Sequence, residues 1–469
     1  MRRDILTVPR EVVNHTVENL SHTLLLHEQP DTNEIVYVDV MLPIRNISAQ
    51  QIHELPLLCR GLVETGTADL DGSSFIEHIG MHTGGISASL SVIPEKQSSV
   101  EFEDKFDVRL VLSGKATEGN VIRLIEYLEK ALLESDLKAT TRIQEILKEK
   151  IKSMESTIMD SGHSIAAMKL RSKLKRSSWF VDQYQGLAYY DALRQLGGSL
   201  DRNKEGTMAS LCDDLSRLRQ QIVNQDSITV NITGSAAGIS LAEEQVRGLL
   251  NRIGQNRTRK DGHIVIPSED LMPVSGANEL LIIPSQVNYV VQGALLLDSD
   301  LGQANGSWQV ATRYLQNSWL WNQVRVIGGA YGSYCSLNDR SGVFTFASYR
   351  DPGMQNTIDV YDRSANFLDD LTLSCPELDK AIVGTISEMD APEPASAKGY
   401  KDTLRYLSGF TDADRQKFRD EVLATQESDF KDLAQAMRNF SKNKINVVVG
   451  GENIEDTQDI QWEVRSVFH

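Results

Sequence analysis

The sequence predicts an α+β fold made of two tandem, homologous domains, each with a largely antiparallel sheet and helices packed on one face. Three observations predict it. β-Branched runs alternate with long helical stretches, the chain is long enough at 469 residues for separate cores, and three sequence patterns occur twice. The two copies are offset by roughly 240 residues, which indicates an internal duplication.

The repeated patterns follow the same order in both copies. "EIVYVDV" pairs with "QVNYVVQ", "HTGGISASLSV" pairs with "IGGAYGSYCSL", and "ITVNITGSAAG" pairs with "INVVVGGENIE". Each copy therefore contains a strand, a helix, a glycine turn, further strands, helices and a last strand. We expect one domain over residues 1–255 and the other over residues 256–469, with the polar, glycine-bearing stretch 251–276 as the linker between them.

The first copy contains the elements that a helix-covered sheet requires. "EIVYVDVML" and "KFDVRLVLSGKA" predict strands, and "ISASLSVIP" predicts another after the turn Gly84–Gly85. "AQQIHELPLLCRGLVETGT" predicts a helix, and a shorter helix follows that Ser73 or Ser74 would cap. Longer helical stretches are predicted for 118–175, broken near "DSGHS", and for 181–224.

The second copy repeats this order. "ELLIIPSQVNYVVQGALL" is typical of a strand, and "SWQVATRYLQNSWLWNQVRVI" has apolar residues at helical spacing. A glycine turn and a hairpin closed by "NDRSG" come next. Helices are expected over about 354–440, and "NKINVVVGGENIED" predicts a strand, a turn and the start of a helix.

The composition and the chain start narrow the possible partners. Asp and Glu total 65 against 48 Lys and Arg, a formal net charge of -17, so we expect no nucleic-acid partner. Four widely spaced cysteines form no CxxC pair, which argues against a disulfide framework or a zinc ribbon. No apolar run approaches the roughly 20 residues that cross a bilayer. The start, "MRRDILTVPREVV", lacks the features of a signal or transit peptide, so we expect no targeting segment.

The common catalytic motifs are incomplete in this sequence. His78 and His82 lie four residues apart near Glu77, but the inverted zinc motif HxxEH would need a histidine where Ser74 stands. "TGSAAGIS" and "VGGENIED" match no phosphate loop, and no GxSxG occurs. Cys335 fits a small buried side chain. A metal pair at His78 and His82 stays as a minor hypothesis, and otherwise no metal is expected in this chain.

The segment "RVIGGAYGSYCSLNDRSGVFTFASYRD" places two hydrogen-bond donors around a glycine turn. Arg325 ends the preceding predicted helix, and Tyr331 begins the next strand. The chain bends between and after them at Gly328, Gly329 and Gly332. Two donors aimed at one point can hold a peptide carbonyl or stabilise an oxyanion. On spacing alone a structural role is favoured, with the arginine bonding helix-end carbonyls and the tyrosine packing over the turn.

The stretch "NSWLWNQVRVIGGAYGSYCSLNDRSGVFTFASYRDPGMQNTIDVYD" resembles the C-terminal half of the presequence protease family. These proteins are pitrilysin-type, inverzincin metallopeptidases. Further similar segments follow the family's order along nearly the whole chain, among them "LPLLCRGLVETGTADL", "DSGHSIAAMKLRSKL", "IPSQVNYV" and "AKGYKDTLRYLSGFTDADRQKFRDEVL". The opening "ILTVPREVV" resembles the segment just after the linker between the two halves of the family enzymes.

The resemblance implies a pitrilysin-like α/β roll for each copy, corresponding to the third and fourth of four domains in two bowl-shaped halves. In the family, an arginine and a tyrosine of the second half contact the substrate backbone, and they match Arg325 and Tyr331 here. The resemblance therefore favours the functional role over the structural one. Gly328, Gly329 and Gly332 fall on the family's substrate-binding turn. The zinc motif belongs to the N-terminal half, so zinc is expected there and no cofactor is expected in this chain.

The resemblance thus implies the substrate-binding half of a zinc metalloendopeptidase that degrades short unstructured peptides, such as cleaved organellar presequences. Its expected partner is the N-terminal zinc-binding half, on the same or a separate polypeptide, without which the chain is expected to be inactive. A noncatalytic peptide-binding or scaffold subunit of the same fold is the alternative. The family implies the mitochondrial matrix or plastid stroma in a eukaryote and the cytoplasm in a bacterium.

Overall fold

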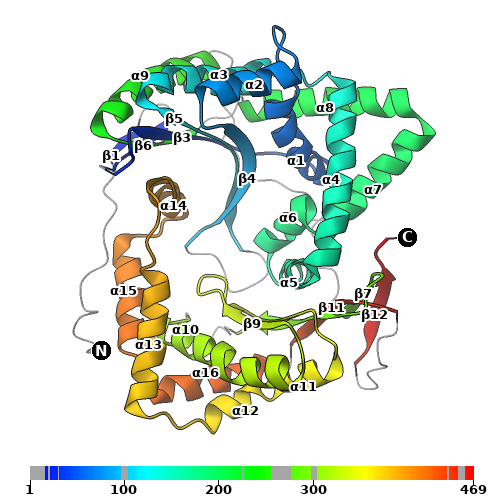
Figure 1. Ribbon diagram of the computed structural model, residues 1–469, viewed down its shortest axis with the longest axis vertical. Coiled ribbons are helices and arrows are strands. Elements are labelled where there is room, and N and C mark those ends of the chain that lie inside the picture. The colour runs from blue at the N-terminus through cyan, green and yellow to red at the C-terminus, as the bar shows by residue number, and fades with distance from the viewer. Residues whose placement is uncertain are drawn as a thin grey trace.

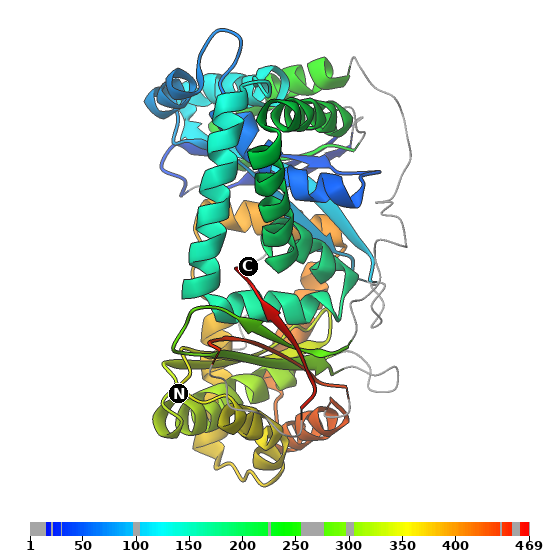
Figure 2. The ribbon, with the colours of Figure 1, turned by 90° about the vertical axis from the view of Figure 1, so that its right-hand side faces the viewer.

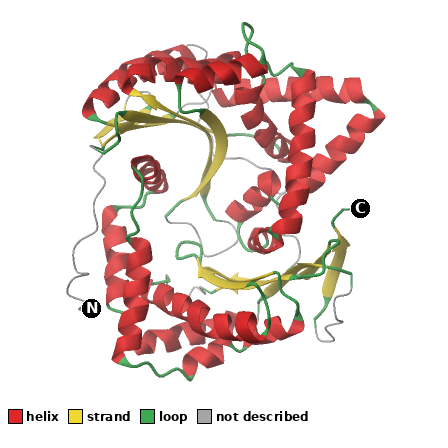
Figure 3. Cartoon of the chain, viewed as in Figure 1, coloured by secondary structure: helices red, strands yellow, loops and turns green. Residues whose placement is uncertain are grey.

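Two six-stranded sheets lie one above the other along the long axis of the molecule, and each carries helices on its outer side (Figures 1 and 2). The computed structural model describes residues 16–19, 22–29, 31–96, 104–223, 227–254, 276–296, 304–440, 443–452 and 460–468. Figure 3 shows the strands of both sheets facing the middle of the molecule, with most helices outside them. Among the described residues, no helix is long and apolar enough to cross a membrane.

The first sheet has the strand order β1-β2-β6-β3-β5-β4 and is antiparallel except between β2 and β6. Valines and leucines alternate along β3 and β5, and this period-2 pattern turns one face of the sheet toward the core. Its strands are β1 (Thr16–Asn19), β2 (Thr23–Glu28), β3 (Ile35–Pro43), β4 (Ile86–Pro94), β5 (Phe106–Thr117) and β6 (Thr229–Gly234).

Helices of the first half cover the outer face of this sheet and extend down one side of the molecule (Figure 1). Helices α1, α3 and α9 contact the sheet directly. The helices are α1 (Ala49–Glu64), α2 (Gly72–His82), α3 (Val121–Glu134), α4 (Thr140–Asp160), α5 (Gly162–Ser172), α6 (Arg176–Gln185), α7 (Leu187–Arg202), α8 (Lys204–Val223) and α9 (Ala236–Gly254), with the 3-10 turn η2 (Glu118–Asn120) before α3.

The second sheet has the strand order β12-β7-β11-β8-β10-β9, with parallel pairs only at β12–β7 and β7–β11. Its strands are β7 (Asn278–Ile282), β8 (Tyr289–Leu295), β9 (Gly332–Leu337), β10 (Val343–Tyr349), β11 (Ile445–Gly450) and β12 (Trp462–Ser466). Its outer helices are α10 (Gly306–Leu315), the π-helix η4 (Gln316–Ile327), α11 (Gln355–Asp362), α12 (Ser364–Asp369), α13 (Cys375–Met389), α14 (Ala395–Ser408), α15 (Asp412–Leu423) and α16 (Glu427–Phe440), of which α14 alone leaves this layer.

The order of the strands confirms the predicted α+β class with two homologous, largely antiparallel sheets. Strands β6, β3, β5 and β4 take the same successive places in the first sheet as β11, β8, β10 and β9 take in the second. These are the pairs that the repeated sequence patterns indicate. The expected domain boundary at 255 and 256 lies outside the described residues, as does most of the expected linker.

Some local predictions were wrong. Helix α2 is capped by Asp71, whose carboxylate accepts a hydrogen bond from the Ser74 amide at 2.8 Å, so neither Ser73 nor Ser74 is the cap. The stretch after Gly276 forms two strands, β7 and β8, because a turn at "PSQVN" separates them. The helix expected after Gly306 changes to a π-helix at Gln316. The helix start expected after Gly451 lies outside the described residues.

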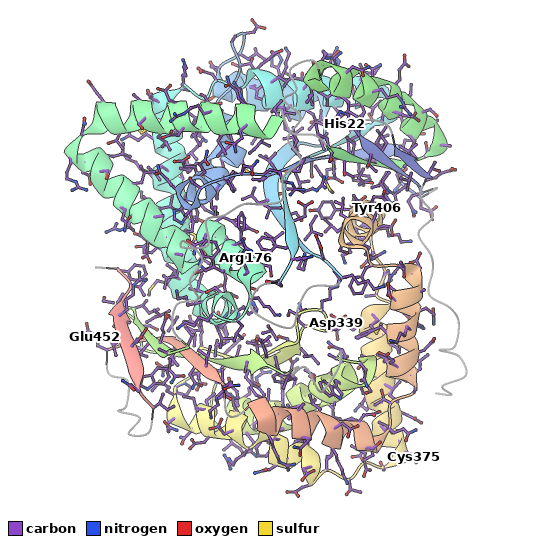
Figure 4. All side chains as sticks on the ribbon, turned by 180° about the vertical axis from the view of Figure 1, so that it is seen from behind. His22, Arg176, Asp339, Cys375, Tyr406 and Glu452 are labelled. Carbon is purple, nitrogen blue, oxygen red and sulfur yellow. The ribbon has the colours of Figure 1, made fainter. Side chains whose placement is uncertain are left out.

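Each half also places one helix on the inner face of the other half's sheet, which the sequence did not predict. Helix α5 packs on β8, β10 and β11 of the second sheet, and α14 packs on β6 and β4 of the first. Figure 4, seen from behind, shows α14 with Tyr406 beneath the first sheet and Asp339 on the hairpin of the second. The helices on one face were therefore predicted correctly, but the opposite face is covered by a helix exchanged from the other half.

Buried polar contacts hold these exchanged helices in place. His27 on β2 lies with its Nδ1 2.7 Å from the Asn231 side chain and its Nε2 3.0 Å from the Asp402 carboxylate on α14. On the other crossing, Lys173 at the end of α5 forms an ion pair with Glu279 of β7 at 2.6 Å. All five side chains are buried, so each pair joins the two halves away from solvent.

Candidate functional site

The turn between η4 and β9 is positioned by an unusual helix end. Asn305 caps α10 by accepting a hydrogen bond from the Trp308 amide, and the helix widens to π geometry from Gln316 onward. The Gly328 amide donates to the Gln323 carbonyl at 2.9 Å, a π-type bond five residues back. Short π-helical segments are frequent at functional sites, because they reorient the side chains of the last turn.

The three glycines of the turn meet different backbone requirements. Gly329 has φ +83°, a left-handed conformation that side chains other than glycine rarely adopt. A Cβ on Gly328 would lie 2.6 Å from the Val324 carbonyl oxygen, so the close helix end requires a glycine there. A Cβ on Gly332 would meet the Tyr334 hydroxyl at 2.7 Å, a side chain that can move. The turn therefore needs the first two glycines more than the third.

The guanidinium of Arg325 lies over the ring of Trp321, 4.0 Å from its centroid. This cation–π contact holds the half-buried side chain along η4. The carbonyl of Arg325 accepts from the Gly329 amide and that of Val324 accepts from the Ala330 amide, so backbone amides bond these helix-end carbonyls. In the described part of the chain no carboxylate pairs with Arg325. Its donors are therefore directed to neither of the partners that a structural role would provide.

Tyr331 stands at the entry to β9 with 68% of its surface exposed. Its amide donates to the Tyr349 carbonyl at 3.0 Å, and its ring meets the Tyr349 ring edge-on at 5.8 Å. The backbone is thus fixed while most of the phenol ring remains in solvent. A tyrosine that only packed over the turn would be mostly buried, so the geometry supports a binding role.

Large apolar side chains surround the two donors on the surface. Within 14 residues of chain, five of them are exposed, and exposed apolar groups of this density mark interaction surfaces. They are Trp321, Val326, Ile327, Tyr331 and Tyr334. They lie on η4 and on β9, which is an edge strand of its sheet. An edge strand beside apolar side chains can add an extended peptide as a further strand.

His163 is a member of this site that the sequence analysis did not identify. It begins the first-half helix α5, and its ring lies 4.9 Å from the Tyr349 ring and 6.0 Å from the Tyr334 ring. Burial lowers the pKa of His163, so its imidazole is neutral at pH 7. The contact means that the first half supports the Tyr331 side of the turn. The helix break at "DSGHS" was the only sequence signal for it.

The other candidates have ordinary surroundings. The His82 ring stacks on the Tyr127 ring at 6.2 Å. Within the described ranges, no three His, Cys, Asp or Glu side chains gather closely enough to hold a metal ion. Cys335 is buried, its thiol contacts the Thr312 carbonyl at 3.2 Å, and burial raises its pKa, so it is not a reactive thiolate.

Comparison with solved structures places the fold among pitrilysin-like proteins. Pitrilysin matches over 98% of this chain and 46% of its own length, with a TM-score of 0.62 and 12% identity. A conserved protein from Enterococcus faecalis matches over 94% of this chain and its full length, with a TM-score of 0.65 and 14% identity. At these identities the likeness concerns the fold alone.

Sequence comparison is more specific. Residues 278–452 match the family model described as "PreP C-terminal domain", and residues 2–196 match a second model, described as a peptidase-associated region of the same metallopeptidase family. Presequence protease 1, chloroplastic/mitochondrial, of Arabidopsis thaliana is 34% identical over 92% of this chain and 38% of its own length. Protein HypA of Clostridium perfringens is 29% identical over 94% and 44%, and the mitochondrial presequence protease of Saccharomyces cerevisiae is 26% identical over 99% and 46%.

The chain belongs to the pitrilysin-type presequence protease family and corresponds to its C-terminal half. It spans less than half the length of these curated relatives. The resemblance inferred from the sequence is thereby confirmed.

Proposed function

We propose that this chain is the substrate-binding half of a zinc metalloendopeptidase that degrades short unstructured peptides, such as cleaved presequences. The observation that carries the proposal is the pair Arg325 and Tyr331, whose donors face no structural partner and lie within an exposed apolar surface. The repeats would be its third and fourth domains. The names of the relatives favour a mitochondrial or plastid location, with a bacterial cytoplasm as the alternative.

The proposed site acts on the carbonyl of the scissile peptide bond. The guanidinium N–H groups of Arg325 and the hydroxyl of Tyr331 donate hydrogen bonds to that oxygen as it gains negative charge. The glycine turn lets the peptide backbone approach, and the apolar surface receives its side chains. The net charge of -17 favours encounter with basic peptides.

The described residues offer no set of ligands that fits a zinc ion. We propose that zinc is held by an N-terminal half carrying HxxEH, on the same or a separate polypeptide. The test is reconstitution with that half from a relative or from the upstream reading frame. The chain alone should show no peptide cleavage, and the mixture should cleave. Chelator-sensitive cleavage by the chain alone would contradict the proposal, and no cleavage by a stable complex would favour a scaffold.

We predict that His163→Ala in the reconstituted enzyme lowers kcat/KM about tenfold, because Tyr349 loses the ring that holds it against Tyr331. His163→Phe keeps a ring of similar shape and should restore most of the activity. The matched control is His78→Ala on α2, which should leave kcat/KM unchanged. Peptide cleavage rates measured between pH 6 and 8 check this prediction. Equal losses for His163→Ala and His163→Phe would show that Tyr349 does not depend on ring packing.

A further inference from the structure

A cavity of about 800 Å³ lies between α1, α7 and α8, on the first half of the chain. Helices α7 and α8 meet at an angle, and α1 lies on the inner side of that angle (Figure 1). The volume falls within the range of sites for small organic ligands. None of the residues lining it belongs to η4, β9 or α5, so it is separate from the proposed peptide site.

Glu54 provides the unusual chemistry of this cavity. Only 6% of the residue is exposed, and its Oε1 accepts a hydrogen bond from the Gln50 side chain at 3.1 Å. Its Oε2 is buried and has no hydrogen-bond partner in the described part of the chain. A buried carboxylate oxygen without a donor is costly, and natural proteins rarely retain one without a use for it. Glu54 lines the cavity, so a ligand there can supply the missing donor.

The charge around Glu54 is negative. Asp214 on α8 also lines the cavity, while no lysine or arginine is among the described lining residues. Asp214 is itself paired with Arg217, and the His53 ring bonds the Gln183 side chain at 3.0 Å. Helix α7 contributes no titratable side chain to the lining. The remaining polar groups are neutral hydrogen-bonding side chains: Gln50, Gln195, Ser199, Asn203, Thr207 and Ser210.

These features select a class of ligand. Two carboxylates and neutral acceptors suit a cation with several N–H donors, because charge-assisted hydrogen bonds need both. A metal ion fits less well, since no three His, Cys, Asp or Glu side chains of the described residues gather here. We propose that this cavity binds an ammonium or guanidinium group, with Glu54 as its counter-ion, from either a free amine or a basic peptide side chain.

Binding should depend on pH with a definite sign. Burial raises the pKa of Glu54 to about 7, and the Asp214 charge adds to that shift. A cation binds the ionised carboxylate, whose population rises about tenfold from pH 6 to pH 8. Affinity should therefore rise about tenfold over this range. A site formed by Asp214 alone would show no such dependence, because an ordinary aspartate is already ionised at pH 6.

The experiment measures the melting temperature of the whole chain with L-argininamide, and with the neutral analogue L-citrullinamide, at pH 6 and pH 8. Argininamide should raise Tm at pH 8 and much less at pH 6, while citrullinamide should not raise it. A blocked dipeptide with an internal arginine separates the two sources, because only a site open to peptides accepts it. No Tm rise with argininamide up to millimolar concentrations, or an equal rise with citrullinamide, would overturn the proposal.

Variants connect the effect to Glu54. Glu54→Gln should weaken argininamide binding at least about tenfold and remove its pH dependence. Glu77→Gln, which removes an exposed carboxylate on α2, is the matched control and should bind like the parent chain. Ser199→Phe, which narrows the cavity without changing charge, should also weaken binding. Unchanged binding by both cavity variants would show that the amine binds elsewhere.

The folding of Glu54→Gln can be checked independently. Because the folded-state pKa is raised, the parent chain loses stability as pH rises from about 5 to 8, and this loss is complete above the folded pKa. The glutamine variant cannot ionise. It should melt at the same temperature as the parent at pH 5 and at a higher temperature at pH 8. A variant that melts lower at both values has been disrupted, and Ser199→Phe then decides the proposal.

Discussion

Arg325→Ala in the reconstituted enzyme should lower kcat/KM for peptide cleavage about 100-fold, and Tyr331→Phe should lower it about tenfold. Loss of one preorganised donor to a developing oxyanion typically has an effect of this size. Most of the loss should fall on kcat, because the hydrogen bonds strengthen as charge develops in the transition state. Steady-state kinetics on a peptide of defined sequence measure it.

The same arginine variant should unfold almost like the parent chain. Arg325 is half-buried, and its one described contact is the stacking on Trp321, which is worth at most about 1 kcal/mol. Arg340→Ala is the matched control, because that guanidinium also lies 4.0 Å from the centroid of an aromatic ring, that of Phe410. It should leave kcat/KM unchanged. If Arg325→Ala and Tyr331→Phe both cleaved at the parental rate, the assignment of the site would be wrong.

The sequence was sufficient for the topology of the two sheets because the duplication is written in short, local patterns. Strands and the glycine turns between them depend on alternation and on backbone freedom, which a window of ten residues contains. The pairing of "HTGGISASLSV" with "IGGAYGSYCSL" accordingly placed β4 and β9 at equivalent edges. The change to π-helix at Gln316 was not predictable, since apolar spacing is nearly the same for both helix types.

Contacts between the halves were beyond reach for a different reason. His163 reaches Tyr349 only because α5 crosses to the second sheet, and 186 positions of sequence separate the two residues. Glu54 in "IHEL" was read as part of a failed zinc motif, because the cavity that surrounds it is completed by α7 and α8. Candidate residues within one segment could therefore be found from the sequence, whereas those that depend on tertiary packing could not.

The exchanged helices give the second large expected effect. Gly399→Ala should lower the free energy of unfolding by about 2 kcal/mol, because a Cβ there would lie 1.9 Å from the Thr233 hydroxyl oxygen on β6. The helix α14 must move away from the first sheet to admit it, and the gain in helix propensity offsets only about 1 kcal/mol. Denaturant unfolding measures the change.

Gly198→Ala in α7 is the control for that variant, because nothing lies within 4 Å of the added Cβ. It should raise the free energy of unfolding by about 0.5–1 kcal/mol through helix propensity alone. Adding Thr233→Ala to Gly399→Ala removes the clashing oxygen and should recover part of the loss. No recovery, or no loss in Gly399→Ala itself, would mean that α14 does not depend on this close approach.

The equivalent substitution on the other crossing separates stability from function. A Cβ on Gly162 would lie 2.3 Å from the Tyr289 ring, so Gly162→Ala should displace the start of α5 and destabilise the chain to a similar extent. The next residue is His163, which contacts Tyr349 beneath Tyr331. Gly162→Ala should therefore also lower kcat/KM in the folded, reconstituted enzyme. Gly399→Ala should not, because α14 lies on the first sheet, away from the turn. Equal effects of both variants on turnover would show that the two crossings act as one rigid unit.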